Sequence, residues 1–401
     1  MLKKLQNTDI KNKRVIIRCD FNVPIKDSKV LDDTRIYESL ETINYCLENN
    51  ASVILMSHLG RIKEEKDLEE NTLEPVSLVL SDVLGRDVKF VSETHGKEFE
   101  NILKNIKCGD VILIENTRYE DLDGKKESGC DLKLAKYWAS FADVFVNDAF
   151  GTIHRSHASN VGIAKFIPSC IGFLVQKELK VLEELKKPEK PYVLILGGKK
   201  VNDKIGVLKK LLPKVDYLLV GGGMALTFLK AEGFLVGNSV VDYESIDFCK
   251  ELLKKYEDKI VLPVDVRVNN KFKNYGKIKN VDITSISDDE IALDVGPKTA
   301  KVYKNILMDA KTVFWNGPLG VYEFSNFIVS TDAVLKFLIK KHIKTVLGGG
   351  DVVAASALLG YKDKVYHAST GGGATLEFLE GKTLPGIVAI KEGCKKWVLL
   401  S

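Results

Sequence analysis

The stretch from Tyr192 to Lys204, YVLILGGKKVNDK, decides how this chain of 401 residues folds. Its five consecutive apolar residues, Tyr192–Leu196, predict a strand that is covered on both faces. The glycines and polar residues that follow predict a turn into a helix. Other short runs rich in Val, Ile and Leu recur along the chain with helical patterns between them. This alternation is typical of parallel βαβ units, so the sequence predicts the α/β class.

These apolar runs are predicted as strands in both halves of the chain. They lie at 14–18, 52–56, 110–114 and 143–146 in the first half, and at 192–196, 217–220, 260–264, 312–315, 345–347 and 365–367 in the second. Between the halves, apolar residues at helical spacing predict a helix over Phe173–Lys187, and Pro188 and Pro191 follow it directly. Such a helix is suited to connect two domains.

The composition narrows the class of protein. At about 150 residues per domain the length predicts two or three domains, and 45% hydrophobic residues suffice for more than one core. A net charge of +4 is too small for an electrostatic nucleic-acid binder. Seven cysteines without a C-x-x-C pair predict neither a disulfide framework nor a zinc site, which favours the cytoplasm. The sequence has no apolar signal-peptide core and no run of membrane-spanning length, so no membrane association is expected.

Glycines follow the strands of the second half. They stand at 197–198, 221–223, 348–350 and 371–373. Glycines at helix starts let the backbone N–H groups approach an anion, so four such sites in series predict a nucleotide site. The dinucleotide fingerprint G-x-G-x-x-G fails because Leu226 and Val353 occupy its third glycine position, and a P-loop fails because Leu376 occupies its first.

Charged residues accompany these glycines. Lys199, Lys200 and Lys204 follow the strand 192–196, where they either form a solvated face or neutralise a transferred phosphoryl group. Asp351 follows Gly348–Gly350 and is either a Mg²⁺ ligand beside nucleotide phosphates or a helix cap. Glu323 either holds a ribose hydroxyl or lies in a surface turn.

The strands of the first half are followed by a different chemistry. Polar residues, mostly arginines, histidines and amides, follow these strands in the sequence: Asp20, Asn22 and Arg35; His58 and Arg61; Asn116 and Arg118; His154, Arg155 and His157. Any one of these arginines alone is explained by a surface ion pair. Their recurrence at successive strand ends predicts a local cationic surface for phosphate and carboxylate groups of a small metabolite.

The same motifs, in order, resemble phosphoglycerate kinase from about residue 14 to residue 387. They are RVIIRCDFNVP, SHLGR, ENTRYE, FVNDAFGTIHRSHASNVGIA, LGGKKVNDKI, VGGGMALTFLKAEG, LPVD, LDVGPKT, WNGPLGVYEF, LGGGD and HASTGGGATLEFLEGKTLPGI. The resemblance implies two Rossmann-like parallel-sheet lobes: a phosphoglycerate-binding domain over 1–172 and a nucleotide-binding domain over 188–387. A hinge helix over 173–187 joins them, and the tail 388–401 returns to the first lobe.

The resemblance also implies roles for individual residues. Substrate-binding positions fall on Asp20, Phe21, Asn22, Arg35, His58, Leu59, Gly60, Arg61, Arg118 and Arg155. Nucleotide-binding positions fall on Lys200, Lys204, Ala292, Asn316, Glu323, Gly349, Gly350, Asp351 and Val352. Arg35, Lys200 and Lys204 are the implied catalytic residues, and Asp351 is the implied ligand of the Mg²⁺ that accompanies ADP or ATP.

The implied reaction transfers a phosphoryl group reversibly from 1,3-bisphosphoglycerate to ADP, giving 3-phosphoglycerate and ATP in glycolysis. The attacking group is already anionic, so catalysis needs positioning and charge neutralisation rather than a general base. Because the cationic residues lie on two lobes, hinge closure is expected to complete the site and exclude water. The family expectation is a cytoplasmic monomer that acts on these small molecules, without nucleic acid or membrane.

Three departures from the family pattern stand out. Val352 replaces the usual hydroxyl residue after GGGD, and we expect its position to face the phosphates, so that Val352→Thr would tighten nucleotide binding. Ala292 replaces a glycine that often precedes the LDVGP motif. The tail, EGCKKWVLLS, extends beyond the expected end of the family pattern, and we expect its Trp397, Val398 and Leu399 to contact the first lobe.

Other functions remain open at this stage. A nucleotide-binding regulator without catalysis predicts losses at Arg35, Lys204 or Asp351, and these residues are present. A nicotinamide-dependent dehydrogenase is disfavoured by the missing glycine fingerprint. A small-molecule kinase of another family shares the glycine loops but leaves the arginine series unexplained.

Overall fold

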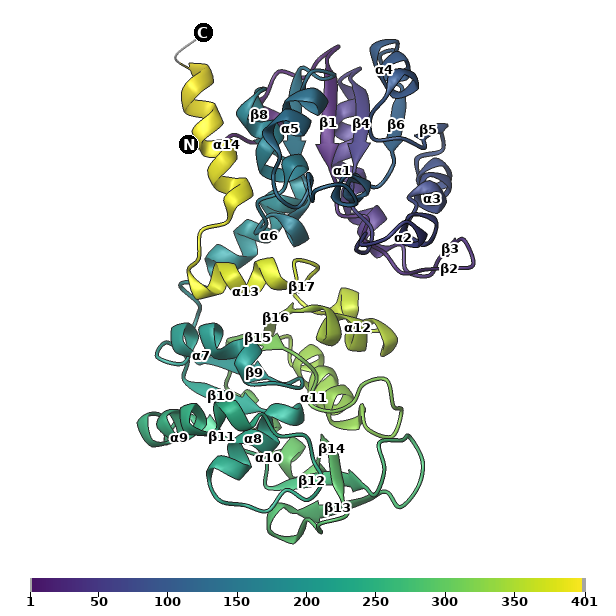
Figure 1. The fold of residues 1–401 in the computed structure, drawn as a ribbon. Helices are drawn as coiled ribbons and strands as arrows, with labels where there is room; N and C mark the ends of the chain where they lie inside the picture. The colour runs from purple at the N-terminus through teal and green to yellow at the C-terminus, as the bar shows by residue number, and fades with distance from the viewer. Residues whose placement is uncertain (1, 399–401) are drawn as a thin grey trace. The chain divides into compact units, whose positions relative to one another are not determined.

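The computed structural model describes residues 2–398, with side chains described as far as Gly393. Contacts divide the chain into two compact units. The first unit is Met1–Lys180 with Thr383–Ser401, and the second is Val181–Lys382. Figure 1 shows that each unit is built around its own sheet.

The first unit contains a six-stranded sheet in the order β5-β6-β4-β1-β7-β8, with every pairing parallel. Its strands are β1 (Arg14–Arg18), β4 (Ser52–Met56), β5 (Val88–Val91), β6 (Val111–Ile114), β7 (Val144–Asn147) and β8 (Ser169–Ile171). All residues of β4, β6 and β7 are buried, because helices cover both faces of a parallel sheet. A short hairpin, β2 (Ile25–Lys26) and β3 (Lys29–Val30), lies outside this sheet.

Helices of the first unit cover the two faces of this sheet. They are α1 (Thr34–Glu48), α3 (Glu74–Leu84), α4 (Lys97–Lys104), α5 (Leu132–Ala139) and α14 (Pro385–Val398). The short helix α2 (Lys66–Glu70) buries no residue, and α6 (Phe173–Glu184) runs from the first unit into the second, which begins at Val181. Alternate strand side chains such as Val15 and Val53 share one core cluster with Ile43 of α1 and Leu80 of α3. On α5, buried Trp138 donates its indole N–H to the carbonyl of Thr94, 2.9 Å away.

Short helical turns complete the first unit. Those of 3-10 type are Leu5–Asn7, Thr117–Asp121, Phe150–Thr152 and Ile163–Lys165, and a π-helical turn spans Ala158–Gly162.

The second unit contains another six-stranded parallel sheet, in the order β11-β10-β9-β15-β16-β17. Its strands are β9 (Tyr192–Leu196), β10 (Tyr217–Val220), β11 (Ile260–Val261), β15 (Thr312–Asn316), β16 (Lys344–Gly348) and β17 (His367–Ser369). The strand order reverses between β9 and β15. In open α/β sheets ligands bind beyond the carboxyl ends of the strands at such a reversal.

Helices also cover both faces of this second sheet. They are α7 (Ile205–Leu211), α8 (Gly222–Ala231), α9 (Ile246–Lys255), α10 (Pro297–Leu307), α11 (Val329–Lys340), α12 (Gly350–Leu358) and α13 (Gly373–Glu380). One core cluster joins Val193 and Trp315 of the sheet to Tyr303 of α10 and Leu335 of α11. Short 3-10 turns span Asn202–Lys204, Tyr243–Ser245, Ile283–Ser285 and Lys362–Lys364.

An additional antiparallel sheet, absent from the sequence prediction, lies in the second unit. It is ordered β13-β12-β14 and consists of β12 (Asp265–Asn269), β13 (Lys279–Asp282) and β14 (Ile291–Val295). The predicted strand 260–264 is wrong beyond Val261, because Pro263 has no N–H for a ladder and separates β11 from β12.

The predicted α/β class with two parallel sheets is confirmed. Two strands of the first sheet, β5 and β8, were missed, because VKFV and SCI are not continuously apolar runs. The helix predicted to Lys187 ends at Glu184.

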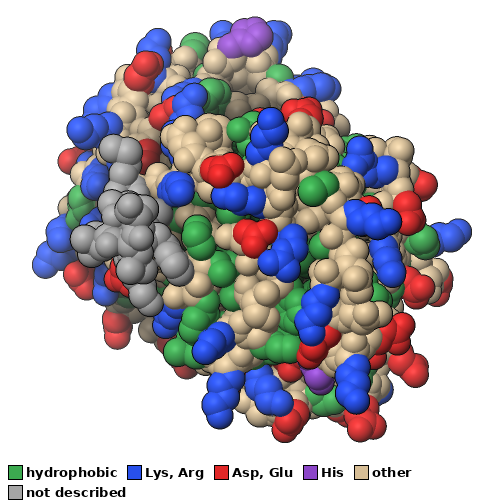
Figure 2. Space-filling model, turned by 90° about the horizontal axis from the view of Figure 1, so that it is seen from above, with side chains coloured by type: hydrophobic (Ala, Val, Ile, Leu, Met, Phe, Trp, Pro, Cys, Tyr) green, Lys and Arg blue, Asp and Glu red, His purple; other side chains and the backbone are tan. Residues whose placement is uncertain are grey.

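Surface charges are mixed on the face shown in Figure 2. Among the described residues of that face, Lys and Arg side chains are interspersed with Asp and Glu. Within residues 2–398, none of the helices has both the length and the apolar character needed to cross a membrane.

Helix α14 follows Thr383, where the chain rejoins the first unit, and it contacts the turns at Ala158–Gly162 and Ile163–Lys165 and strand β8. The N–H of Gly386 donates to the carbonyl of Ile153, 3.0 Å away. Ile390 is fully buried. The side chains of Trp397, Val398 and Leu399, for which we predicted contacts, lie outside the described residues.

Replacing Ile390 by alanine is expected to lower the free energy of unfolding by about 2–5 kcal/mol, because a large buried side chain is removed. Urea unfolding followed by circular dichroism measures this change. Exposed Lys391 on the same helix gives the control, Lys391→Ala, which should have little effect. Equal stabilities of the two variants would show that α14 does not depend on this burial.

Candidate active site

Arg18 ends β1 at the carboxyl edge of the first sheet, in register with Met56 of β4 and Asn147 of β7. Its side chain is fully buried. Its Nε donates to Ser159 Oγ over 2.9 Å, and its Nη1 donates to the carbonyl of Cys19. The sequence analysis did not select Arg18, although an arginine that closes an apolar strand is a visible signal.

Two further arginines lie near Arg18, and we call Arg18, Arg118 and Arg155 the arginine cluster. Their charges act on one another at Arg118, whose pKa is lowered by burial and then by Arg155 and Arg18. Burial and the same arginines hold the pKa of His58 well below its usual range and lower that of His157 to about 3. Both imidazoles are therefore neutral at pH 7, and the arginines carry the charge that would attract an anion.

Asp20 and Arg35 form an ion pair at the same edge. Arg35 Nη1 lies 2.5 Å from Asp20 Oδ2, and the Arg35 side chain remains 31% exposed while that of Asp20 is 7% exposed. The other oxygen of Asp20, Oδ1, is buried without a hydrogen-bond partner. Asp20 thus keeps an acceptor for a hydroxyl group, and Arg35 keeps a solvent-facing surface for a charged ligand.

Amide side chains fix the SHLGR loop, residues 57–61, through hydrogen bonds to its backbone. Asn116 accepts the N–H of Leu59 and donates to its carbonyl, at 3.1 and 2.7 Å, and Asn22 accepts the N–H of Gly60 at 2.9 Å. Gly60 has φ +58°, and a β-carbon there would lie 1.8 Å from the side chain of Asn71, so the position requires glycine. Arg118 Nη1 donates to the carbonyl of Gly60 over 3.0 Å.

The structure therefore brings together most of the predicted substrate residues. Phe21 and Leu59 differ from the rest, because their side chains belong to the hydrophobic core and do not face a ligand. The N–H of Phe21 is already donated to Ser57 Oγ. Arg61 is exposed at the end of its loop. Glu127 and Ser159 were not predicted from the sequence, because neither directly follows a strand; Ser159 hydrogen-bonds to both Glu127 and Arg18.

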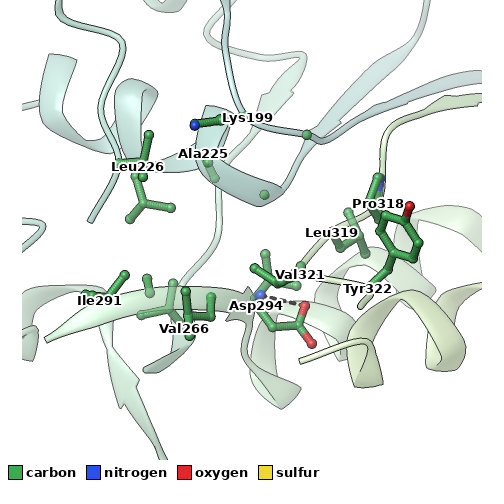
Figure 3. A pocket seen from close by; sticks show the side chains of 18 of the residues that line it. Lys199, Ala225, Leu226, Val266, Ile291, Asp294, Pro318, Leu319, Val321 and Tyr322 are labelled. Atoms are coloured by element: carbon green, nitrogen blue, oxygen red, sulfur yellow. Dashed lines mark hydrogen bonds between the residues drawn. The ribbon is translucent and has the colours of Figure 1, made fainter. Parts of the chain in front are cut away.

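The second unit has a cavity of about 500 Å³, within the roughly 300–1,000 Å³ of small-molecule sites. It is lined by the glycines after β9 and β10, by α8, by the antiparallel sheet and by the segment after β15. Its lining includes Gly198, Lys199, Gly222, Gly223, Leu226, Val240, Val266, Phe272, Ile291, Ala292, Leu293, Asp294, Val321, Tyr322, Glu323 and Asp351. Figure 3 shows Lys199 and Ala225 on one side of this cavity and Val266, Ile291 and Asp294 on the other.

The cavity has two chemically different parts. Aliphatic and aromatic side chains such as Leu226, Val266 and Phe272 suit a planar base. The glycine loops, Lys199 and Asp351 instead offer N–H groups and charges to phosphates and a cation. The predicted residues Ala292, Glu323 and Asp351 line the cavity, whereas Lys200 is exposed outside its lining.

Beside the cavity, Asn316 connects three strand ends. Its Oδ1 accepts a hydrogen bond from Lys204 Nζ, and its Nδ2 donates to the carbonyl of Gly348. Gly349 has φ +109°, and a β-carbon there would lie 2.4 Å from Asn316 Nδ2, so glycine is required. Burial lowers the pKa of Lys204 to about 8, while the charge of Asp351 opposes this shift.

Two carboxylates of the cavity differ in setting. Asp351 lies in the first turn of α12. Asp294 is buried, accepts the backbone N–H of Ser330 at 3.0 Å, and has its pKa raised to about 8 by burial. We therefore regard Asp351 as the candidate ligand of a cation, and Asp294, which the sequence analysis did not select, as a support for the cavity wall.

The prediction that the Val352 side chain faces the phosphates is wrong. Its side chain is fully buried and belongs to the core cluster that contains Trp315 and Leu335. Only its backbone N–H, in the open first turn of α12, is available to a phosphate. A threonine there would bury a hydroxyl group in apolar surroundings, so the tighter nucleotide binding expected for Val352→Thr has no structural basis.

Comparison with known proteins shows the family of this chain. The family model of phosphoglycerate kinase matches residues 5–382. The chain is 52% identical over 393 residues to the phosphoglycerate kinase of Enterococcus faecalis, with 97% of this chain and 99% of that protein covered. It is 51% identical over 395 residues to that of Fusobacterium nucleatum, with coverage of 97% and 99%.

Two solved structures of phosphoglycerate kinases are also similar to this chain. The phosphoglycerate kinase from Coxiella burnetii is matched with a TM-score of 0.85 and 38% identity, over 98% of this chain and 99% of that chain. The enzyme from Pyrococcus horikoshii is matched with a TM-score of 0.87 and 31% identity, over 99% and 100%. With the arginine cluster on one sheet edge and the glycine-lined cavity on the other, the chain belongs to the phosphoglycerate kinase family.

Proposed function

We propose that Arg35 in the first unit and Lys200 and Lys204 in the second are the catalytic residues of this kinase. As a member of its family, the enzyme is a phosphotransferase of glycolysis whose acceptor is a carboxyl group. The observation that carries the assignment is the separation of chemistry between the two sheet edges. One edge gathers arginines around Asp20, and the other gathers glycine loops, Lys204 and Asp351 around the cavity.

The transfer itself requires little from the protein in covalent terms. An oxygen of the ADP β-phosphate attacks the acyl phosphate of 1,3-bisphosphoglycerate, and the bond from phosphorus to the carboxyl oxygen breaks. The electron pair stays on the departing carboxylate, so no proton has to move. Catalysis then depends on position and on neutralising the oxygens of the transferred group, which is the role of Arg35, Lys200 and Lys204.

In this proposal the phosphoglycerate lies on the first unit. Arg118 and Arg155 bind its anionic groups, together with neutral His58, Asn22 and the backbone at Gly60. The free Oδ1 of Asp20 accepts its hydroxyl group. Arg61, exposed at the loop end, contributes further charge. Phe21 and Leu59 shape the site from the core, because their backbone N–H groups are already donated to Ser57 and Asn116.

The nucleotide lies in the cavity of the second unit. Its base packs in the apolar part beside Ala292, its ribose bonds Glu323, and its phosphates reach Asn316 and the N–H groups from Gly349 to Val352. The donor set suits Mg²⁺, because Asp351 offers one carboxylate and Mg²⁺ takes one or two carboxylates with phosphate oxygens. Bound there, Mg²⁺ would neutralise phosphate charge. We further propose a cytoplasmic monomer that acts on these small molecules alone.

Replacing Arg35 by alanine is expected to lower kcat at least about 10³-fold, because a single charge that stabilises a phosphoryl-transfer transition state contributes that much. A coupled assay of ATP formation from 1,3-bisphosphoglycerate and Mg-ADP measures it. The control is Arg14→Ala, which removes an arginine of the same unit that pairs with Asp143. A rate within a few-fold of wild type would remove Arg35 from the transfer site.

Replacing Asp351 by asparagine is expected to weaken Mg-ADP binding while leaving metal-free ADP binding nearly unchanged, because the carboxylate acts through the cation. Calorimetry with and without Mg²⁺ tests this. The matched control is Asp332→Asn, since Asp332 occupies the first turn of α11 as Asp351 does in α12. If both variants bind Mg-ADP like the wild type, Asp351 serves as a helix cap.

The pH dependence of nucleotide use should reflect Lys204. Its pKa is lowered to about 8, so the ammonium group is charged below pH 8 and loses its proton as the pH rises through that value. We expect kcat/KM for the nucleotide, which reports the free enzyme, to fall above pH 8. Lys204→Arg keeps its charge and should lose this decline. A profile in which both enzymes decline alike would assign the ionisation to another group.

A further inference from the structure

We infer that Glu127 is a positioning residue for the phosphoglycerate site: acting through Ser159, it holds Arg18 in the arginine cluster. This inference rests on the proposed function of that cluster. Neither the motifs of the sequence nor the mechanism above uses Glu127. The side chain is nevertheless fully buried directly behind the cluster.

The contacts form a continuous chain from Glu127 to Arg18. Glu127 Oε2 accepts the backbone N–H of Ser159 at 2.9 Å, and Oε1 accepts the hydroxyl of Ser159. The same Ser159 Oγ accepts Arg18 Nε at 2.9 Å. A hydroxyl group has one donor and two acceptor positions, so Ser159 can serve both partners at once. Thr117 Oγ1 adds a bond to Glu127 Oε1 at 3.2 Å.

The positive charge of Arg18 explains why a carboxylate is buried at position 127. Arg18 is fully buried, and its pKa is lowered by burial while Glu127 and Asp20 oppose that shift. Burial likewise raises the pKa of Glu127, and Arg18 opposes it most strongly. Asp20 already pairs with Arg35. Glu127 is therefore the carboxylate that balances the buried guanidinium, because an unbalanced buried charge is strongly unfavourable.

Glu127 also fixes the backbone that carries Arg155. Its carbonyl accepts the N–H of Ala158 at 2.9 Å, at the start of the π-helical turn. In that turn, Asn160 Nδ2 donates to the carbonyl of Arg155 at 2.7 Å. His157 Nδ1 lies 3.7 Å from Glu127 Oε1. The Glu127 side chain thus reaches Arg18 through Ser159, while its backbone carbonyl supports the turn that holds Arg155.

The test replaces Glu127 by glutamine, which keeps the shape, removes the charge and leaves one acceptor oxygen where the carboxylate has two. We expect KM for 3-phosphoglycerate to rise about tenfold or more, as for loss of a hydrogen bond to a charged group. KM for ATP should stay within about twofold, because the nucleotide cavity lies in the second unit. Calorimetric titration with 3-phosphoglycerate should show the same loss.

The matched control is Glu120→Gln. Glu120 is a buried glutamate of the same unit whose side chain contacts Thr94 and His95 instead of the cluster. This variant should lose stability without a change in either KM. If Glu127→Gln behaves in the same way, Glu127 is a structural acid only and the inference is wrong.

A double-mutant cycle with Ser159→Ala tests the relay. If Glu127 acts through Ser159, the double variant should bind 3-phosphoglycerate about as weakly as Glu127→Gln alone. Additive losses would overturn the relay. Should Glu127→Gln fail to fold, Ser159→Ala alone decides: an unchanged KM for 3-phosphoglycerate would overturn the inference. Failure of the proposed function is distinguishable, because the unaltered enzyme would then not turn over 3-phosphoglycerate and ATP.

Discussion

The carboxyl ends of parallel strands meet at one edge of a sheet, and both halves of the site depend on this constraint. In the first unit, the pairing of β1 with β4 and β7 sets Arg18 level with Met56 and Asn147. The loops that follow these strands must then meet, although they are far apart in sequence. In the second unit, the same constraint brings Lys204, Asn316 and Gly348 into contact. The residues in the loops after the strands therefore gather at the carboxyl edge of each sheet.

The concentrated positive charge of the arginine cluster is the main unfavourable electrostatic contribution at the carboxyl edge of the first sheet. Arginines that approach one another beneath the surface repel and lose hydration, so their arrangement needs compensation. Glu127 supplies part of it from behind and Asp20 supplies part from the front. His58 and His157 add no charge, because the arginines and burial keep them neutral. The remaining positive potential is held ready for an anionic ligand, a form of electrostatic preorganisation.

At the carboxyl edge of the second sheet, apolar and polar groups line different walls of the cavity. The antiparallel sheet contributes Val266 and Ile291 to one wall of the cavity, while the glycine loops open backbone N–H groups at the other. Glycine at 349 permits the close approach of Asn316, which in turn holds Lys204. Lys204 is thereby kept in a partly dehydrated position where its charge acts strongly.

The sequence by itself determined the class of fold and much of the chemistry. Runs such as YVLIL and SVILM are apolar throughout and predict buried parallel strands, and the residues behind them predict what each edge binds. Local pattern could not give the antiparallel sheet, because its strands DVRVN, KNVD and IALDV mix charged and polar residues with apolar ones and pair across intervening loops. It could not orient Val352 either: a residue at a helix start faces core or ligand according to how that helix packs, and here it faces the core. Arg18 and Glu127 became a pair only through tertiary structure, because one ends a strand and the other lies in a loop, and only folding removes both from water and makes each the partner that the other requires.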